Sequence, residues 1–163
     1  MKFIYLLMAV VLALVAVRTD AAVTPNSFVS AQTPTRGIVQ FLQGTDVAGT
    51  YKTLYTAGSN GSRCNAIWLT HDDQTNTHLI NVQIVSSSVK YGGPQYTTVV
   101  SGGAGLFITP INLMTAAIWP GLPTDSDGNP YVQLASGDTL QATFATALVT
   151  SGVINIVVSC ADF

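Results

Sequence analysis

Residues 121–163, GLPTDSDGNPYVQLASGDTLQATFATALVTSGVINIVVSCADF, decide the fold of this chain. They hold three short apolar runs, at 131–136, 139–147 and 153–160, which are separated by the turn-forming sequences Gly-Asp and Thr-Ser-Gly. In the last run Ile154, Ile156, Val158 and Cys160 share one face, and its β-branched residues favour strand over helix. The C-terminal third therefore predicts three strands of a sheet with one buried face.

The composition of the whole chain agrees with an all-β domain. Its 163 residues are enough for one domain with a core. Charged residues make up only 9%, the net charge is −2 and no basic patch occurs, which argues against nucleic-acid binding through phosphate contacts. Thr, Ser, Gly, Val and Ala dominate, and no long stretch has a helical period.

Residues 1–22 read as a secretory signal peptide. Lys2 precedes an apolar run over residues 3–17, and small residues follow, with Ala21 and Ala22 at the expected cleavage site. The run is shorter than the roughly 20 residues that span a bilayer, and an uncleaved membrane anchor is the alternative. Residues 23–36 contain two prolines and no period, so we expect an extended N-terminal arm, which either leads into the first strand or docks on a neighbouring subunit.

Residues 37–163 are expected to form the folded domain. Further strand candidates lie between Gly- and Pro-containing turns, at 37–42, 51–56, 62–70, 78–86 with a continuation at 89–91, and 95–100. Strict alternation over 62–70 places Cys64, Ala66, Trp68 and Thr70 on one face. With the C-terminal runs this gives about eight strands. It predicts an all-β fold, a single antiparallel β-sandwich, with a jelly-roll-like arrangement as one form of it.

The chain has two cysteines, Cys64 and Cys160, and both fall on the apolar faces of expected strands. In an oxidising compartment they can form a disulfide that closes a long loop. Two separate buried thiols that pack as small hydrophobic side chains are the open alternative.

No residues form a recognisable catalytic, cofactor or metal motif, and we expect a protein that is not an enzyme and holds no cofactor. His71, Asp72, Asp73 and His78 lie close in sequence, but their spacing matches no standard metal site and a polar loop is preferred. Residues 125–129, DSDGN, resemble part of a calcium loop but lack its final Glu, so a turn is expected.

Two further features have surface interpretations. Residues 60–62, NGS, fit a glycosylation sequon. The aromatic side chains either pack in the core or line a carbohydrate-binding face. They are Trp68, Trp119, Tyr51, Tyr55, Tyr91, Tyr96 and Tyr131.

The chain over residues 23–163 resembles small β-sandwich proteins encoded among the structural genes of tailed bacteriophages and prophages. The matching segments are 24–27 (TPNS), 51–56 (YKTLYT) with the loop 58–62, 67–70 (IWLT), 110–114 (PINLM), 119–123 (WPGLP) with 125–130, 136–141 (SGDTLQ) and 161–163 (ADF). These are turn and strand signatures rather than catalytic motifs. The resemblance implies a non-enzymatic virion protein, such as a head decoration, head fibre or spike component, whose partners are other virion subunits or copies of itself.

The signal-like start departs from that resemblance, because virion proteins assemble in the cytoplasm. Either the chain is an exported relative or translation starts near Val23. The alternative function is a secreted or periplasmic β-sandwich binding module, with carbohydrate as a possible ligand. The expected location is accordingly the virion, or the periplasm or exterior, and the only expected membrane contact is an uncleaved N-terminal segment.

Overall fold

The computed structural model describes residues 33–101, 107–148 and 152–163, which belong to one compact unit, Ala31–Phe163. The signal-like segment 1–22, its cleavage site at Ala21 and Ala22, and residues 23–32 of the expected arm lie outside the described residues. Those expectations therefore stay predictions. Among the residues that are described, no helix is long and apolar enough to cross a bilayer.

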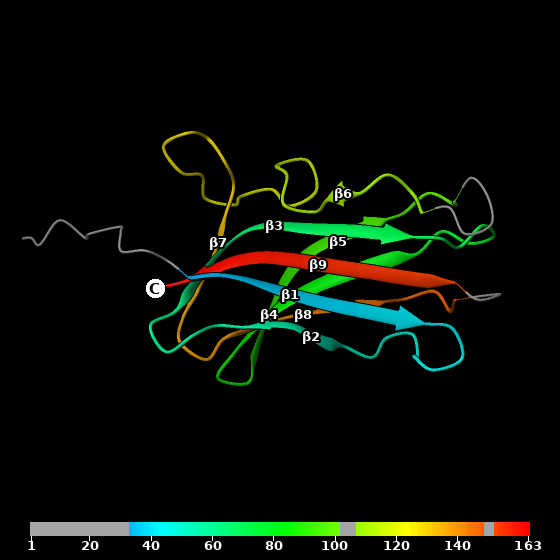
Figure 1. Cartoon of the computed structure of the whole chain (residues 1–163), viewed down its shortest axis with the longest axis horizontal. Coiled ribbons are helices and arrows are strands. Elements are labelled where there is room, and N and C mark those ends of the chain that lie inside the picture. The colour runs from blue at the N-terminus through cyan, green and yellow to red at the C-terminus, as the bar shows by residue number, and fades with distance from the viewer. Residues whose placement is uncertain (1–32, 102–106, 149–151) are drawn as a thin grey trace, which may run out of the picture. The chain divides into compact units, whose positions relative to one another are not determined.

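The described residues form nine β-strands and two antiparallel sheets, which confirms the predicted all-β sandwich. The strands are β1 (Thr33–Leu42), β2 (Lys52–Thr56), β3 (Ser62–His71), β4 (Leu79–Ser86), β5 (Val89–Thr97), β6 (Ile111–Asn112), β7 (Val132–Leu134), β8 (Thr139–Phe144) and β9 (Val153–Asp162). Sheet A has the order β1-β9-β3-β6, with β7 also on β3, and sheet B has the order β2-β8-β4-β5. In Figure 1, β1, β9 and β3 of sheet A lie side by side.

The strand pairs show a chain folded back on itself once. The first strand pairs with the last, β2 with β8, β3 with β6 and β7, and β4 with β5. Several strand boundaries differ from those expected, and two of the differences affect how the strands are assigned. β1 takes in residues 33–36 of the predicted arm, because β9 continues to Asp162 and offers them partners. Residues 89–91 do not continue the run at 78–86 as expected; with residues 92–97 they form β5, and residues 98–100 of the run at 95–100 lie outside that strand.

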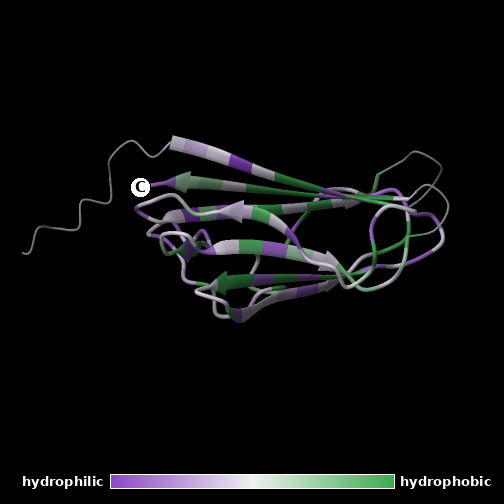
Figure 2. Cartoon of the chain, turned by 90° about the horizontal axis from the view of Figure 1, so that it is seen from below, coloured by the Kyte–Doolittle hydropathy of each residue, from purple (hydrophilic) through white to green (hydrophobic). Residues whose placement is uncertain are grey.

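Alternating side chains of both sheets fill the space between them. Ile154, Ile156, Val158 and Cys160 of β9 are buried, as the period-two pattern predicted. Phe41 of sheet A meets Phe144 of sheet B edge to face, with ring centroids 5.1 Å apart. Figure 2 shows the same alternation as hydrophobic and hydrophilic bands along the strands.

A β-bulge in β3 overturns the predicted face of that strand. Cys64 pairs with Cys160, but Ala66 pairs with the next residue, Ser159, so Asn65 is one extra residue. The inward positions therefore change from Ser62 and Cys64 to Ile67, Leu69 and His71, while Trp68 points to solvent. The predicted common face of Cys64, Ala66, Trp68 and Thr70 is wrong, because a bulge shifts the alternation by one residue.

Cys64 and Cys160 lie directly opposite each other on β3 and β9, and their Sγ atoms are bonded. Both side chains belong to the core. The bond links two neighbouring strands whose cysteines are 96 residues apart in the sequence. A cross-link of this span removes much of the conformational freedom of the unfolded chain.

At the end of the sandwich that holds Asp162, hydroxyl groups tie the two sheets together. Tyr55 of β2 and Ser62 of β3 both donate hydrogen bonds to the Asp162 carboxylate, and Thr35 donates to the Tyr55 hydroxyl at 2.9 Å. The Ser62 and Tyr55 hydroxyls hold the pKa of Asp162 below its ordinary value. The end of β9 is thus anchored to both sheets.

Gly37 allows β1, at the edge of sheet A, to approach β2, at the edge of sheet B. A Cβ atom built on Gly37 would stand 1.9 Å from the backbone oxygen of Leu54. Real Cβ atoms do not come that close to backbone, so a side chain here forces β1 away from β2.

We expect Gly37→Ala to lower the free energy of unfolding by about 3 kcal/mol or more, because the clash is with backbone that cannot rotate away. Gly92→Ala is the matched control, since a Cβ on Gly92 meets nothing within 4 Å and its φ is not positive. That control is expected to be neutral or stabilising by less than about 1 kcal/mol. Urea unfolding of both variants measures the difference, and equal stabilities would contradict the close approach of β1 and β2.

We predict that the disulfide persists in the purified protein and stabilises it by about 4 kcal/mol on the chain-entropy model. The variant C64A/C160A should unfold at lower denaturant concentration than the wild type. The reduced wild type should match that variant, because both lack the cross-link. Intact mass under non-reducing conditions gives the bond directly, and two free thiols in native protein would refute the prediction.

Candidate functional site

The outer face of sheet A carries three rows of side chains that run across β1, β9 and β3. One row holds Ile38, Val157 and Trp68, which are paired in register. A row of Arg36, Ser159 and Ala66 lies on one side of it, and a row of Gln40, Asn155 and Thr70 on the other. Since alternate residues of a strand share a face, all nine side chains belong to the surface that points away from the core.

The middle of this face is apolar and open to solvent. Ile38 is 65% exposed and Trp68 is 43% exposed. A groove of about 670 Å³ runs beside the indole and is lined by Arg36, Trp68, Thr70, Pro110, Val157 and Ser159. An exposed indole beside a groove offers a large apolar plane with one hydrogen-bond donor, so we treat this groove, the sheet A groove, as one candidate site.

The end of the sandwich that lies opposite Asp162 provides a second candidate surface, which we name the four-loop end. It consists of residues 42–51, 72–78, 98–101 with 107–110, and 145–148 with 152. Hydrogen bonds join these loops: Gln43 N donates to the Gly152 carbonyl at 3.2 Å, and Ser101 N donates to the Asp73 carbonyl at 2.7 Å. Four separate stretches of sequence thus form one end of the sandwich.

Two of these loops, 42–51 and 98–101 with 107–110, expose large apolar side chains. The exposed side chains are Leu42, Val47, Tyr51, Val99, Val100 and Phe107. The acidic side chains of the same end are all engaged. Asp46 binds Lys52 at 2.6 Å, Asp72 accepts from Val153 N at 2.6 Å, and Asp73 binds His78 at 3.0 Å. Within the described residues this end therefore offers apolar and uncharged polar groups.

Beneath the four-loop end lies a buried network of His71, Asp73 and His78, and no part of either imidazole is exposed. His71 Nε2 lies 2.6 Å from the Val99 carbonyl oxygen, and its Nδ1 accepts the Asp73 backbone N–H at 3.2 Å. A carbonyl can only accept and an N–H can only donate, so His71 is the neutral tautomer with its proton on Nε2. The two rings meet edge to face at 5.4 Å.

His78 has a different environment because both of its ring nitrogens face oxygen. Nδ1 lies 3.1 Å from the Thr146 carbonyl oxygen and Nε2 lies 3.0 Å from Asp73 Oδ2. A carbonyl can only accept, so His78 Nδ1 donates to Thr146, and a second hydrogen bond joins Nε2 to the Asp73 carboxyl group. Asp73 Oδ1 also accepts from Thr75 N and Asn76 N, at 2.8 and 3.0 Å. The network joins three of the four loops to one another, 72–78, 98–101 and 145–148.

The structure thus brings together three of the four residues that the sequence marked as a weak metal candidate, in a hydrogen-bonded arrangement. His71, Asp73 and His78 use their polar atoms on one another and on backbone, and Asp72 points to β9 instead. In the described part of the chain no group of three or more His, Cys, Asp or Glu side chains could hold a metal ion.

Residues 125–129 form the expected turn. Asp125 Oδ1 accepts from the backbone N–H groups of Asp127 and Asn129, at 3.0 and 2.8 Å, and Gly128 has a φ of 82°. Asp125 Oδ2 binds Arg63 at 2.8 Å. These backbone N–H donors and Arg63 hold the pKa of Asp125 below its ordinary value. Both carboxylate oxygens are used by protein donors, which is typical of a structural turn.

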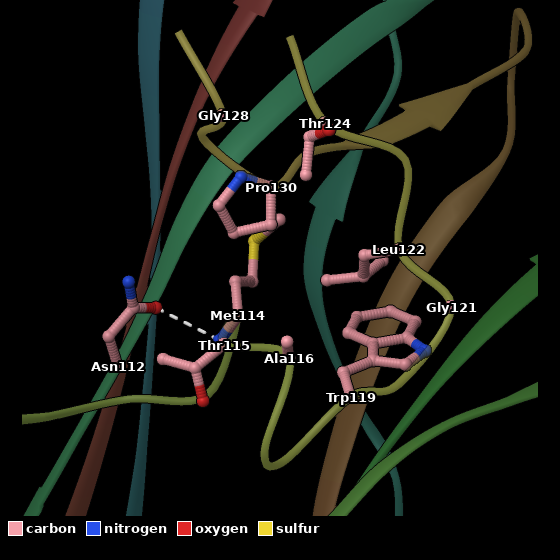
Figure 3. Close-up of a pocket in the computed structure, with 10 residues that line it drawn as sticks. All are labelled: Asn112, Met114, Thr115, Ala116, Trp119, Gly121, Leu122, Thr124, Gly128 and Pro130. Atoms are coloured by element: carbon pink, nitrogen blue, oxygen red, sulfur yellow. Dashed lines mark hydrogen bonds between the residues drawn. The ribbon is translucent and has the colours of Figure 1, made fainter.

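The segment that follows β6 forms a small apolar pocket of about 340 Å³. Figure 3 shows Trp119 and Leu122 on one side of it and Met114 and Pro130 on the other. Asn112 supports the segment by accepting the Met114 backbone N–H at 3.0 Å. The Trp119 ring also lies 3.3 Å from the Cβ position of Gly93, so this aromatic packs against β5.

The aromatic side chains therefore do not gather on one face. Trp68 lies on the outer face of sheet A, Trp119 lines the small pocket, and Tyr55 donates a hydrogen bond to the Asp162 carboxylate. The Arg63 guanidinium lies 4.1 Å from the ring centroid of Tyr131. Tyr96 packs against the core, and Tyr51 and Tyr91 are exposed. Among these seven aromatic side chains, Trp68 is exposed and lines a groove.

In the sequon, Asn60 lies in an exposed loop and its side-chain nitrogen donates to the Phe163 carbonyl at 3.1 Å. Ser62 is fully buried and donates a hydrogen bond to the Asp162 carboxylate. The atom that glycosylation would modify is therefore engaged in holding the C-terminal residue.

We expect the protein to lose stability as the pH falls below the ordinary His pKa of 6.5. Burial lowers the pKa of His71 in the folded protein. The neighbouring His78 lowers this pKa as well, whereas the carboxylates of Asp73 and Asp72 raise it by a smaller amount. The unfolded chain then binds more protons between the folded pKa and 6.5, so the free energy of unfolding decreases through that window.

The variant His71→Gln tests this expectation, because Gln retains a donor for the Val99 carbonyl and does not titrate. Denaturant unfolding between pH 8 and pH 4 should show a shallower loss of stability for the variant than for the wild type. Parallel curves would show that His71 does not contribute to the pH dependence.

No known protein family and no curated protein matches the sequence. Several solved structures are similar to it, and two of them are viral. A chain of the cyanophage Pam1 capsid asymmetric unit is 18% identical, and the match covers 89% of this chain and 100% of that one with a TM-score of 0.42. The structure of infectious bursal disease virus, Gx strain, is 10% identical over 82% of this chain and 33% of that one, with a TM-score of 0.38. At TM-scores this low, both likenesses are similarities from which no conclusion about this chain follows.

Proposed function

We propose that this chain is a non-enzymatic structural subunit of a virus particle. It attaches to a phage head or another particle, or to copies of itself, through the four-loop end. The observation that carries the proposal is the gathering of apolar side chains there. Six of the eleven large hydrophobic side chains exposed in the described residues belong to this end. Exposed apolar groups concentrated on one surface mark protein interaction sites.

The electrostatics of the four-loop end support the same proposal. Asp46, Asp72 and Asp73 are neutralised or hydrogen-bonded, so no unpaired charge of the described residues has to be desolvated when the end is covered. The low overall charge also reduces repulsion between copies of the chain. Surface complementarity, rather than charge, would hold such a contact together.

The strand order supports the jelly-roll-like form of the sandwich. A jelly roll is a chain folded back once and then rolled into two sheets, and the pairs β1 with β9, β2 with β8, β3 with β6 and β7, and β4 with β5 are compatible with that layout. Viral capsid domains use that layout, as do lectins and cupins, so the layout alone is an analogy.

The second candidate is a secreted or periplasmic binding module. The observation that favours it is the sheet A groove, in which exposed Trp68 lies among the polar side chains of Arg36, Thr70 and Ser159. The disulfide fits an oxidising compartment, and the signal-like residues 1–22 would direct the chain there.

Sedimentation velocity of the purified protein over a range of concentrations tests the structural role. We expect the wild type to associate and the variant V47S/V99S/F107S to remain monomeric, because it loses the three most exposed apolar side chains of the four-loop end. The control V89S/Y91S removes two side chains, each 53% exposed, from the β4–β5 hairpin at the other end and should associate as the wild type does.

Cosedimentation of the protein with virus particles, purified from the culture that produces it, tests attachment to a particle. The proposal is wrong if the wild type stays monomeric and also fails to sediment with the particles. The N-terminal sequence of the native chain separates the two candidates. A start at Ala22 in a periplasmic extract supports the secreted module, whereas a start near Val23 in particles supports the virion subunit.

A further inference from the structure

The sheet A groove contains one charged residue, Arg36, which lies on β1 in the row next to Trp68. Among the residues that the structure describes, the ion pairs are those of Lys52, Arg63 and His78, and Arg36 takes part in none. The nine side chains of the three rows include no carboxylate. The groove therefore presents a positive charge that the described part of its own face does not neutralise.

The rest of the lining combines an aromatic plane with uncharged hydrogen-bonding groups. The Trp68 indole, with Val157 beside it, offers a flat apolar patch, and the Thr70 and Ser159 hydroxyls flank it. Gln40 Nε2 donates to Asn155 Oδ1 at 3.0 Å, which fixes the orientation of both amides in the adjoining row. An amide that is held in place costs less entropy when it binds a ligand.

These groups match one kind of ligand. A pyranose ring has a face of C–H groups, which packs on an aromatic plane, and a rim of hydroxyls, which needs amide and hydroxyl partners. An Arg guanidinium pairs best with a carboxylate, to which it can donate two parallel hydrogen bonds. We propose that the sheet A groove binds an acidic carbohydrate, with a pyranose ring stacked on Trp68 and a carboxylate of the same or the next sugar paired with Arg36.

The spacing of the two residues is compatible with this ligand. β1 and β3 both neighbour β9, so their backbones lie about 10 Å apart across the sheet. The Arg36 side chain starts one row away from Trp68 and both line the same groove. One or two sugar rings span the interval between an indole and a guanidinium that extends toward it.

The same features disfavour a second copy of the chain as the occupant. Packing two of these faces together would bury Arg36 from both copies, and none of the nine side chains is a carboxylate that could pair with it. An unpaired buried charge costs several kcal/mol. Nucleic acid is disfavoured as well, because one cation on a chain of net charge −2 gives little attraction for phosphates.

Two sources of ligand share this chemistry, polysaccharides built from hexuronic acids and glycans that end in sialic acid. Titration calorimetry of the full, oxidised protein with oligogalacturonate and with sialyllactose distinguishes them. Carboxyl-reduced oligogalacturonate, in which each carboxylate is replaced by a hydroxymethyl group, is the matched neutral ligand. We expect one of the acidic ligands to bind at least tenfold more tightly than its neutral counterpart, which for sialyllactose is lactose.

Two variants assign the roles. Arg36→Gln should lower the affinity for the acidic ligand by about 10- to 100-fold, to the level of the neutral one, because it removes a charge-assisted hydrogen bond. Trp68→Ala should weaken acidic and neutral ligands alike, since stacking does not depend on the carboxylate. Trp119→Phe, in the small pocket, is the control and should bind as the wild type does.

Far-ultraviolet circular dichroism and thermal unfolding check that Arg36→Gln and Trp68→Ala remain folded, which their exposed positions lead us to expect. The proposal is overturned if neither acidic ligand binds at millimolar concentration, if neutral and acidic ligands bind equally, or if both variants bind as the wild type does. Pro110 belongs to both surfaces, but none of the side chains changed in the sedimentation test lines the groove, so a negative result here leaves that test of the structural role unaffected.

Discussion

One extra residue in β3 determines the arrangement of the whole of sheet A. β3 pairs with β9 on one side and with β6 and β7 on the other, so its register is shared by every neighbour. Before Asn65 the strand turns Cys64 into the core, where it meets Cys160. After Asn65 it turns Ile67 and Leu69 inward and presents Trp68 to solvent. The bulge thus permits a buried cross-link and an exposed indole on the same strand.

Polar groups close the sandwich at both ends, while apolar side chains fill its middle. At one end the Asp162 carboxylate collects the hydroxyls of Tyr55 and Ser62, which come from different sheets. At the other end His71 and His78 form hydrogen bonds with the carbonyl oxygens of Val99 and Thr146. Buried polar groups need such partners, and here each partner is also a tie between separate segments. The two ends differ in their surfaces, since the apolar loop tips belong to the end above the histidines.

Much of the fold could be predicted from the sequence, because it depends on local patterns. The alternation of β9 and the Gly and Pro turns gave the strands, their approximate limits and the sandwich. The outward position of Trp68 could not be obtained from strict alternation. The signal was present in the spacing, since the inward apolar positions Cys64 and Ile67 are three residues apart, which does not fit a period of two. Recognising it as a bulge requires the partner strand.

The candidate surfaces were less predictable than the strands, because they are made by segments that are distant in sequence. The sheet A groove joins β1, β9 and β3, and the four-loop end joins four connections. His71 and His78 were close enough in sequence to be noticed, but their tautomers depend on Val99 and Thr146, which the sequence places far away. The composition of the chain shows its low charge, but it does not predict that Arg36 lies beside Trp68 in the sheet A groove.

The once-folded path of the chain also constrains how the molecule reaches this structure. Among the paired strands of the described residues, β4 and β5 form a local hairpin, closed by Ser87 and Ser88, both with positive φ. In contrast, β1 cannot pair until β9, far along the chain, has been made. Contacts between distant segments carry a large loop-closure entropy, so folding is expected to be slow for a domain of this size. During synthesis β1 emerges long before its partner, and its apolar residues Val39 and Phe41 stay uncovered meanwhile. A low-charge chain of this kind depends on completing its last strand before it meets other copies of itself.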